Sequence, residues 1–415
     1  MRKMKDSGIE WIGKIPDIWR QTKLKYVTKI RSENGMYSPE QDSYIGLENI
    51  VSRSNKLIET ETIYESALYS ICKKGDILFN KLRPYLAKAI ISPIDGFCTG
   101  ELLNIKHFDG EKRFLWYYLL SDKFIEVVNA STYGAKMPRA NTDFILNLPV
   151  FLPSLSEQTK IADFLEAKCA DIDQIRADIE KQIEIFMDYK KSVITEAVTK
   201  GLNPKSKMKD SGIEWIGQIP EHWGVDKLKF HLKFRGTKNP GDTIVLSLYR
   251  ELGVVPKDSR DDNHNKTSED TSNYRFVRNG DFVINKMKAW QGSVAVSDYE
   301  GIVSPAYYVY GFSDDLIFKR YFHYLLRDKS YATEFKRLSG GIRVGQWDLP
   351  RESLENTLIL LPPISEQKEI AAYLNEKCSE IDATIAEKQK QLKTLEEYKK
   401  SLIFEYVTGK KEVPA

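Results

Sequence analysis

The chain has 415 residues, of which 41% are hydrophobic, and this predicts a multidomain protein with several separate cores. Its four widely spaced cysteines exclude a disulfide scaffold, and without an apolar leader or a run of about 18 apolar residues we expect a cytoplasmic protein with no membrane span. The net charge of +3 leaves nucleic-acid binding undecided, because a local cluster of basic residues is enough for such a surface.

The first feature in chain order is a sequence segment that occurs twice. MKDSGIEWIGKIPDIW at residues 4–19 returns as MKDSGIEWIGQIPEHW at residues 208–223, which lies 204 positions later. A segment that begins with Gly-Asp and ends with Asn, at residues 75–80, likewise returns at residues 280–285. A repeat of about 200 residues is far longer than a solenoid unit. The chain is therefore a tandem duplication, and each copy is a domain with an appendage.

The middle of each copy has an α+β pattern, with short apolar runs between Gly, Pro, Asn and Asp turns. The expected elements are strands at residues 76–79, 283–284 and 306–310, and helix-like segments at residues 114–128 and 316–335. The two middles have diverged, whereas the ends of the copies match closely. We expect one domain at residues 1–153 and a second at residues 203–361.

Each copy ends in a predicted long helix, which enters through PSLSEQ at residues 153–158 and PPISEQ at residues 362–367. Ser156 and Ser365 are the expected N-caps, and a glycine ends each helix. Each helix has about 43 residues and a length on the order of 60 Å. The first helix is assigned to residues 154–202, and the second, with the C-terminal tail, to residues 362–415.

The apolar residues of these helices recur at three- and four-residue spacing and form a narrow stripe. Because so long a stripe cannot be buried by one small domain, we expect the helices to pair with each other as an antiparallel coiled coil. The alternative is that each helix docks on its own domain. The residues expected in the pairing are Ile161, Leu165, Ile172, Ile179, Phe186, Val193, Ile370, Leu374, Ile381, Leu392, Leu395 and Leu402. The duplication further predicts that residues 402–407 lie against the first domain, because residues 215–223 directly follow the first helix.

No catalytic motif is present in the sequence. It has no phosphate-binding G-x-x-x-x-G-K loop, no strand-linked G-x-G-x-x-G and no N-P-P-Y-like methyltransferase site. The five histidines are scattered without metal-ligand spacing. We therefore expect no catalytic residue, no metal site and no cofactor bound by this chain.

The domain middles carry clusters of cations, amides and aromatic residues beside glycine turns, at equivalent places in both copies. Lys and Arg neutralise phosphates, while Arg, Lys, Asn and Gln also form bidentate contacts with base edges. Ordinary solvated loops are the alternative interpretation. The candidate DNA-binding residues are Lys81, Arg83, Tyr85, Lys136, Arg139 and Asn141 in the first copy, and Lys286, Lys288, Trp290, Gln291, Arg343 and Gln346 in the second.

The Gly-Asp turn with its basic segment, the L-P-x-x-S-E-Q entry into a long helix, and the twofold occurrence of the whole unit resemble the specificity subunits of type I restriction-modification enzymes. The resemblance covers essentially the whole chain. It implies two pseudo-symmetric α/β target-recognition domains separated by a long antiparallel two-helix coiled coil, within an α+β chain. It also implies a non-catalytic DNA-binding subunit that reads an asymmetric bipartite target, whose half-site distance the helices set.

The partners that this resemblance implies are double-stranded DNA, two methyltransferase subunits and two restriction subunits. S-adenosylmethionine, ATP and Mg²⁺ would be used by those partner subunits. Two other functions fit parts of the pattern, namely a coiled-coil scaffold with two protein-binding domains and a single-chain methyltransferase. Salt-dependent binding to duplex DNA separates the first of these from a specificity subunit, and S-adenosylmethionine binding to the isolated chain would identify the second.

Overall fold

The computed structural model describes residues 2–134, 136–241, 243–250, 252–259, 267–341 and 347–414. It divides into two compact units, of which unit 1 is Met1–Glu180 with Lys390–Ala415 and unit 2 is Lys181–Gln389. The domain boundaries expected from the sequence follow the ends of the long helices, whereas each unit contains part of both helices.

Unit 1 is built on an antiparallel four-stranded sheet in the order β4-β11-β8-β9. These strands are β4 (Thr28–Ile30), β8 (Ile77–Asn80), β9 (Ala89–Ile91) and β11 (Leu102–Phe108). A second sheet joins β5 (Asn34–Met36), β7 (Leu68–Cys72), β10 (Gly96–Cys98) and β6 (Tyr44–Ile45). The remaining strands form two pairs, β1 (Met4–Asp6) with β2 (Lys14–Pro16), and β3 (Arg20–Lys23) with β12 (Pro149–Leu152). The short helices are α1 (Leu24–Val27), η1 (Pro84–Leu86), α2 (Lys112–Leu119), α3 (Asp122–Ala130) and α4 (Thr142–Asn147).

Unit 2 repeats this plan with the sheet order β16-β23-β20-β21. The strands are β16 (Leu232–Phe234), β20 (Phe282–Asn285), β21 (Val294–Val296) and β23 (Tyr307–Phe312). Four further strand pairs are β13 (Met208–Asp210) with β14 (Gln218–Pro220), β15 (Gly224–Lys227) with β24 (Leu358–Leu361), β17 (Leu246–Tyr249) with β18 (Gly253–Pro256), and β19 (Arg275–Val277) with β22 (Gly301–Val303). The short helices are α6 (Leu228–His231), η2 (Lys257–Ser259), η3 (Ala289–Gln291), α7 (Lys319–Arg327), α8 (Lys329–Leu338) and α9 (Arg351–Glu355). The matching strand orders confirm the predicted α+β class and the pseudo-symmetry of the two copies.

The two helix-like segments expected in the domain middles are each two helices, which corrects the prediction. In unit 1 the chain turns extended at Ser121, between α2 and α3. In unit 2 it turns extended at Asp328, whose side chain accepts a hydrogen bond from the backbone N–H of Ser330 at the start of α8. A polar residue that satisfies the first free N–H groups makes a helix break inexpensive. After each break the second helix packs on the 3-10 helix of its unit, α3 on η1 and α8 on η3.

The long helices are α5 (Leu155–Lys200) and α10 (Ile364–Val407). Both begin earlier than expected, so the assignment of Ser156 and Ser365 as N-caps is wrong. The Ser154 hydroxyl accepts from the Glu157 N–H at 3.3 Å, and the Gln367 N–H donates to the Pro363 carbonyl at 3.0 Å. The residue that makes the entry distinctive is the glutamine that follows Ser-Glu.

Gln158 and Gln367 are buried and perform the same task in the two units. The Gln158 amide donates to the Pro153 carbonyl at 3.0 Å and accepts from the Glu111 N–H at 3.0 Å, directly before α2. The Gln367 amide donates to the Pro362 carbonyl at 2.9 Å and accepts from the Phe318 N–H at 2.8 Å, directly before α7. The S-E-Q motif therefore ties the start of each long helix to the first helix of its domain.

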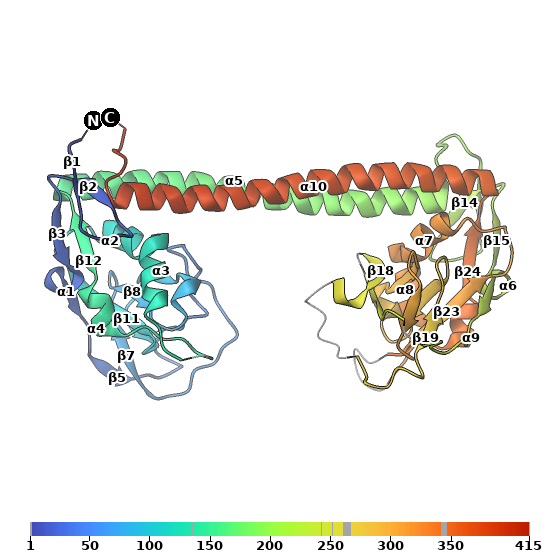
Figure 1. Cartoon of the computed structure of the whole chain (residues 1–415), viewed down its shortest axis with the longest axis horizontal. Helices are drawn as coiled ribbons and strands as arrows, with labels where there is room; N and C mark the ends of the chain where they lie inside the picture. Colours follow the sequence, from blue (N-terminus) through green and yellow to red (C-terminus); the bar gives the residue numbers. More distant parts are fainter. Residues whose placement is uncertain are drawn as a thin grey trace. The chain divides into compact units, whose positions relative to one another are not determined.

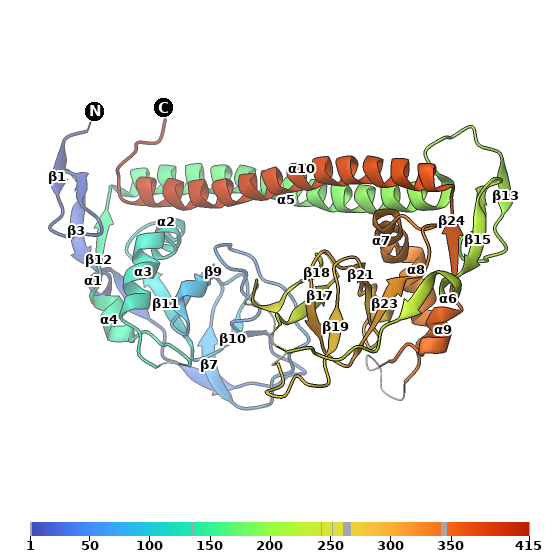
Figure 2. The ribbon, with the colours of Figure 1, turned by 45° about the vertical axis from the view of Figure 1, so that its right-hand side comes forward.

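Within each unit, the parts of the two long helices lie side by side in both views (Figures 1 and 2). In unit 1, Phe164 contacts Tyr406 with ring centroids 4.6 Å apart, and the Lys399 ammonium lies 2.6 Å from the Asp173 carboxylate. Residues further along α5 therefore contact residues earlier in α10, so the two helices run in opposite directions. In unit 2, Lys190 of α5 and Asp382 of α10 form an ion pair at 2.7 Å. These contacts confirm the predicted antiparallel pairing.

The residues predicted for helix pairing are mostly buried. Phe186, Leu392 and Leu395 are partly exposed, and the other nine are buried. Several of the buried residues also join the domain cores, since Ile161, Leu165 and Ile172 belong to the core of unit 1 and Val193, Ile370 and Leu374 to that of unit 2. The stripe is thus shared between the partner helix and the domain at each helix end.

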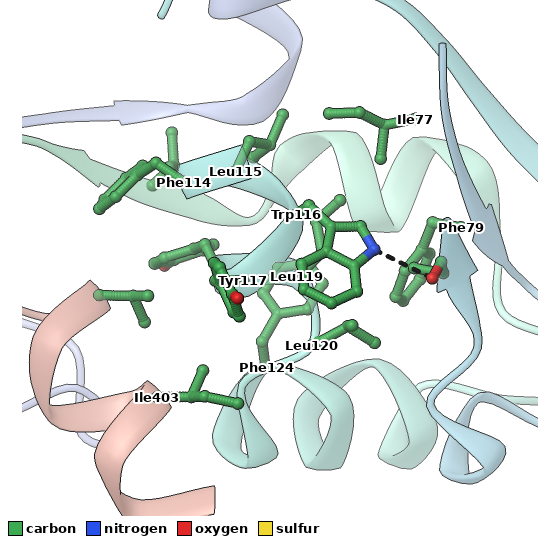
Figure 3. Close-up of a cluster of buried hydrophobic side chains, with 14 of the residues drawn as sticks. Ile77, Phe79, Phe114, Leu115, Trp116, Tyr117, Leu119, Leu120, Phe124 and Ile403 are labelled. Carbon is green, nitrogen blue, oxygen red and sulfur yellow. Dashed lines mark hydrogen bonds between the residues drawn. The ribbon is translucent and has the colours of Figure 1, made fainter. Parts of the chain in front are cut away.

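The chain closes on itself within unit 1, as the duplication predicted. Leu402, Ile403, Tyr406 and Val407 share a buried core with Ile12, Ile15 and Trp19. The Lys410 ammonium donates to the Ile12 carbonyl at 2.7 Å. Figure 3 shows Ile403 of α10 near the side chains of α2 and α3, where the Trp116 indole donates to the Ala89 carbonyl at 2.9 Å. In unit 2 the end of α5 packs on the second copy of the same motif, which includes Trp223.

In the part of the chain that the structure describes, no helix is both long enough and apolar enough to cross a lipid bilayer. Among the same residues, no group of three or more His, Cys, Asp or Glu side chains is placed to hold a metal ion. The four cysteines are buried and unbonded.

His323 in α7 makes unit 2 sensitive to acid. Burial, with the charges of Arg327 and Arg320, lowers the pKa of His323 to about 3. The unfolded chain takes up this proton near pH 6.5 while the folded unit stays neutral, so this contribution to stability is complete above pH 6.5 and falls as the pH drops toward 3. Between pH 7 and pH 5 we expect the free energy of unfolding to fall by about 1 to 2 kcal/mol less in His323→Gln than in the unmodified protein. Urea unfolding of the unmodified protein and the variant at the two pH values measures this difference. Equal losses in the two proteins would contradict the prediction.

Candidate nucleic-acid interface

The Gly-Asp turn before β8 and β20 is a structural support, as its side-chain contacts show. Gly75 and Gly280 have φ of 85° and 82°, a conformation that favours glycine. The buried Asp76 carboxylate accepts from the Lys73 N–H and pairs with Arg31 at 2.7 Å. The Asp281 carboxylate accepts from the Arg278 N–H at 3.0 Å and pairs with Arg235 at 3.0 Å.

Both ion pairs contain a group with a raised pKa, which favours the charged form of Arg31 and disfavours the charged form of Asp281. The hydrogen bond to Asp76 raises the pKa of the Arg31 guanidinium, while burial raises the pKa of the Asp281 carboxyl despite its arginine partner. Both carboxylates fix the conformation of the turn that precedes the central strand. The loop that follows this strand therefore begins at a fixed position.

In unit 1 this loop and the second predicted loop are joined by backbone hydrogen bonds. The Arg83 N–H donates to the Pro138 carbonyl at 2.7 Å, and the Ala140 N–H donates to the Lys81 carbonyl at 2.9 Å. The buried Asn80 side chain braces the first loop, donating to the Leu82 carbonyl at 2.8 Å and accepting from the Lys88 N–H at 3.0 Å. The two basic loops, about 55 residues apart in sequence, therefore form one surface.

The candidate side chains of this surface have different surroundings. Tyr85 and Lys136 are exposed. Arg83 has a left-handed backbone with φ of 52°, and its guanidinium donates to the Lys136 carbonyl at 3.4 Å. Burial lowers the pKa of the Lys81 ammonium, so part of the cost of removing this cation from water is already met in the free protein.

Arg139 and Asn141 each have a contact within the protein. Arg139 is half exposed and forms an ion pair with Glu101, the residue directly before β11. The Asn141 side-chain oxygen accepts from the Asp143 and Phe144 N–H groups, at 2.7 and 3.2 Å, and so caps α4. This cap leaves only the amide donor of Asn141 for a base contact.

Unit 2 joins its two loops in the same way, because the Leu349 N–H donates to the Lys286 carbonyl at 3.0 Å. The Lys286 ammonium pairs with the Asp348 carboxylate at 3.0 Å. Lys288 is exposed and Gln291 is partly exposed. The predicted residues Arg343 and Gln346 lie outside the described residues.

Trp290 has a partner that the sequence did not indicate. Its ring lies 5.4 Å from that of Trp347, with an angle of 58° between the planes, and its indole donates to the Met287 carbonyl at 3.1 Å. Two indoles at the junction of both loops make a rigid aromatic surface. Such a surface suits contact with thymine methyl groups or sugars.

Three features of these surfaces were missed by sequence reasoning. Glu101 and Asp348 were not recognised, because an acid beside basic residues looks like an ordinary charged loop. Arg275 was also missed, although its guanidinium lies over the Phe234 and Tyr308 rings at 5.2 and 5.7 Å. A signal for Asp348 was its place directly after the loop residue Trp347.

Each surface therefore offers cations, amides and aromatic planes at the end of an inner strand of the sheet. These groups can neutralise phosphates and bind base edges. Their arrangement contains no nucleophile with an adjacent base among the candidate residues that the structure describes.

Comparison with known proteins gives consistent results. The family model for the type I restriction modification DNA specificity domain matches residues 9–185 and 232–397. The chain is 28% identical to the type I restriction enzyme MjaVIII specificity subunit of Methanocaldococcus jannaschii, over 96% of this chain and 94% of that one.

Two solved structures share the fold. A chain from a structural study of complex assembly and conformational transition in the type I R-M system aligns with a TM-score of 0.72, at 18% identity, over 95% of this chain and 99% of its own. The HsdS subunit from Thermoanaerobacter tengcongensis aligns with a TM-score of 0.54, at 18% identity, over 97% and 99% of the two chains.

Proposed function

Because this chain belongs to the type I restriction modification DNA specificity family, we propose that it reads a bipartite, asymmetric DNA target, one half with each unit. It acts as a non-catalytic DNA-recognition subunit. The chemistry of methylation and cleavage belongs to partner subunits of a type I restriction-modification complex.

The observation that carries the proposal is the repeated loop framework. Both units join two loops at the end of the central strand by equivalent backbone hydrogen bonds, Ala140 to Lys81 and Leu349 to Lys286. The side chains on this framework differ between the units. The residue directly before the donor of the equivalent hydrogen bond is Arg139 in unit 1 and Asp348 in unit 2. An identical support with different side chains suits two unlike half-sites.

The candidate residues for the contact are those of the two loop pairs. In unit 1 they are Lys81, Arg83, Tyr85, Lys136, Arg139 and the amide donor of Asn141, and in unit 2 they are Lys286, Lys288, Trp290, Gln291, Arg343 and Gln346. Lys136 and Lys288 are exposed and suit phosphates. Arg83 and Arg139 have the planar donors that suit guanine.

In this proposal the long helices set the distance between the two half-sites. Each of them contributes to both units, so the length of helix between the two domains sets the unread spacer between the half-sites. Two methyltransferase subunits and two restriction subunits assemble with the chain. These partners bind S-adenosylmethionine, ATP and Mg²⁺, and this chain binds none of them.

Methylome sequencing tests the proposal. Cells that carry this chain with its methyltransferase partner should show methylated adenines in one motif of two different half-sites with an unread spacer. Deleting the gene for this chain should remove the motif, and replacing residues 20–152 by the corresponding segment of another family member should change one half-site only. A palindromic motif, or one that survives the deletion, would refute the proposal.

A further inference from the structure

The central strand of each unit continues into a lysine that is held on both sides by backbone hydrogen bonds. The Lys81 N–H donates to the Glu101 carbonyl at 2.9 Å, and its carbonyl accepts from the Ala140 N–H at 2.9 Å. The Lys286 N–H donates to the Ala306 carbonyl at 3.1 Å, and its carbonyl accepts from the Leu349 N–H at 3.0 Å.

The strand register confirms that these positions are equivalent. Asn80 is paired with Leu102 in β11, and Asn285 is paired with Tyr307 in β23. Glu101 and Ala306 therefore occupy the same place. Arg139 and Asp348 also share a place, because each directly precedes the residue that donates to the central lysine.

Each unit has an ion pair on this framework, but the charge at one matched position, that of Arg139 and Asp348, is reversed. In unit 1 the cation Arg139 pairs with Glu101. In unit 2 the position of Arg139 is taken by Asp348, which pairs with the Lys286 ammonium at 3.0 Å. Ala306 stands where unit 1 has its acid.

A carboxylate on a DNA-facing surface is repelled by phosphates and can only accept hydrogen bonds. Among base edges in the major groove, its usual donor is the amino group of cytosine. The partner base guanine presents acceptors beside that amino group, which suit a cation. A carboxylate next to a cation therefore matches the edge of one G·C base pair.

One side chain of each pair is accessible for such an exchange. Arg139 and Asp348 are 48% and 47% exposed, while their partners Glu101 and Lys286 are 24% and 27% exposed. An ion pair with one half-exposed partner contributes modestly to the stability of the free protein, so contacts with bases can replace its internal contact at a modest cost.

We infer that each unit reads one G·C base pair with its carboxylate–cation pair, and that the exchange of Arg139 for Asp348 reverses which strand carries the guanine. This inference rests on the proposed function and adds Glu101 and Asp348 as specificity-determining residues. Asp348 accepts from the cytosine amino group while Lys286 donates to the guanine. In unit 1, Glu101 and Arg139 take these two roles.

The first experiment selects binding sequences from a randomised double-stranded DNA library with the full chain assembled with its methyltransferase subunits. We expect Asp348→Asn to lower the preference for cytosine over thymine about tenfold at one position of the half-site read by unit 2. All other positions should be unchanged. Asp315→Asn, an exposed acid before α7, is the matched control and should leave every preference as it was.

The second variant, Asp348→Arg with Ala306→Glu, gives unit 2 the charges of unit 1. We expect the preferred base on the same strand to change from cytosine to guanine. Unchanged base preference in both variants, or an equal loss of affinity for all sequences, would overturn the inference. If the unmodified complex enriches no sequence at all, the proposed function fails, so the two failures are distinguishable.

Discussion

Deleting residues 402–415 is expected to unfold unit 1 while leaving unit 2 folded. The deletion removes Leu402, Ile403, Tyr406 and Val407, all at most 6% exposed, from a core that they share with Ile12, Ile15 and Trp19. Burying a large apolar side chain contributes about 1.5 to 3 kcal/mol, so four of them approach the roughly 5 to 15 kcal/mol that stabilises a whole domain.

Hydrogen exchange followed by mass spectrometry measures this effect. Amides of β8 and β11 should lose their protection in the deleted protein, while those of β20 and β23 keep theirs. Deleting only residues 411–415 is the control, because it leaves all four buried side chains in place. Unchanged protection of β8 and β11 in the longer deletion would contradict the closed arrangement.

Replacing Lys81, Arg83, Lys286, Lys288 and Gln291 together by alanine is expected to lower the affinity for target DNA by more than 100-fold. Removing a side chain that reads a base costs about 1 to 3 kcal/mol, and removing a cation that binds a phosphate reduces the salt slope by about one. The effect should divide by unit. Alanine at Lys81 and Arg83 alone relaxes one half-site, and alanine at the other three relaxes the other.

Fluorescence anisotropy with duplex DNA across a range of salt concentrations measures both quantities. A matched variant with alanine at Lys168, Lys181, Lys191 and Lys393 also removes four positive charges, but from exposed helix positions. It separates the local effect of the loops from the effect of net charge. If the loop variant and the control bind alike, the assignment of the loops is wrong.

Several features of this protein followed from its sequence alone. The near-identical segments at residues 4–19 and 208–223 revealed the duplication, and therefore the matching sheets and the return of α10 to Trp19. Three- and four-residue apolar spacing between a proline entry and a glycine stop located both long helices to within a few residues. These patterns are local or repeated, so the order of the amino acids contains them completely.

Other features needed the tertiary structure. The loop that contains Arg139 meets the loop that contains Lys81 because hydrogen bonds connect segments about 55 residues apart, and no local pattern records which backbone groups will pair. The roles of Glu101 and Asp348 depend on that register, as does the matching of Arg139 with Asp348. The sequence of Asn141 and its neighbours likewise fits a base-reading residue, but in the structure its side-chain oxygen accepts hydrogen bonds from the first free N–H groups of α4. Side-chain chemistry is set by sequence, but the neighbours that use it are set by the long-range packing of the chain.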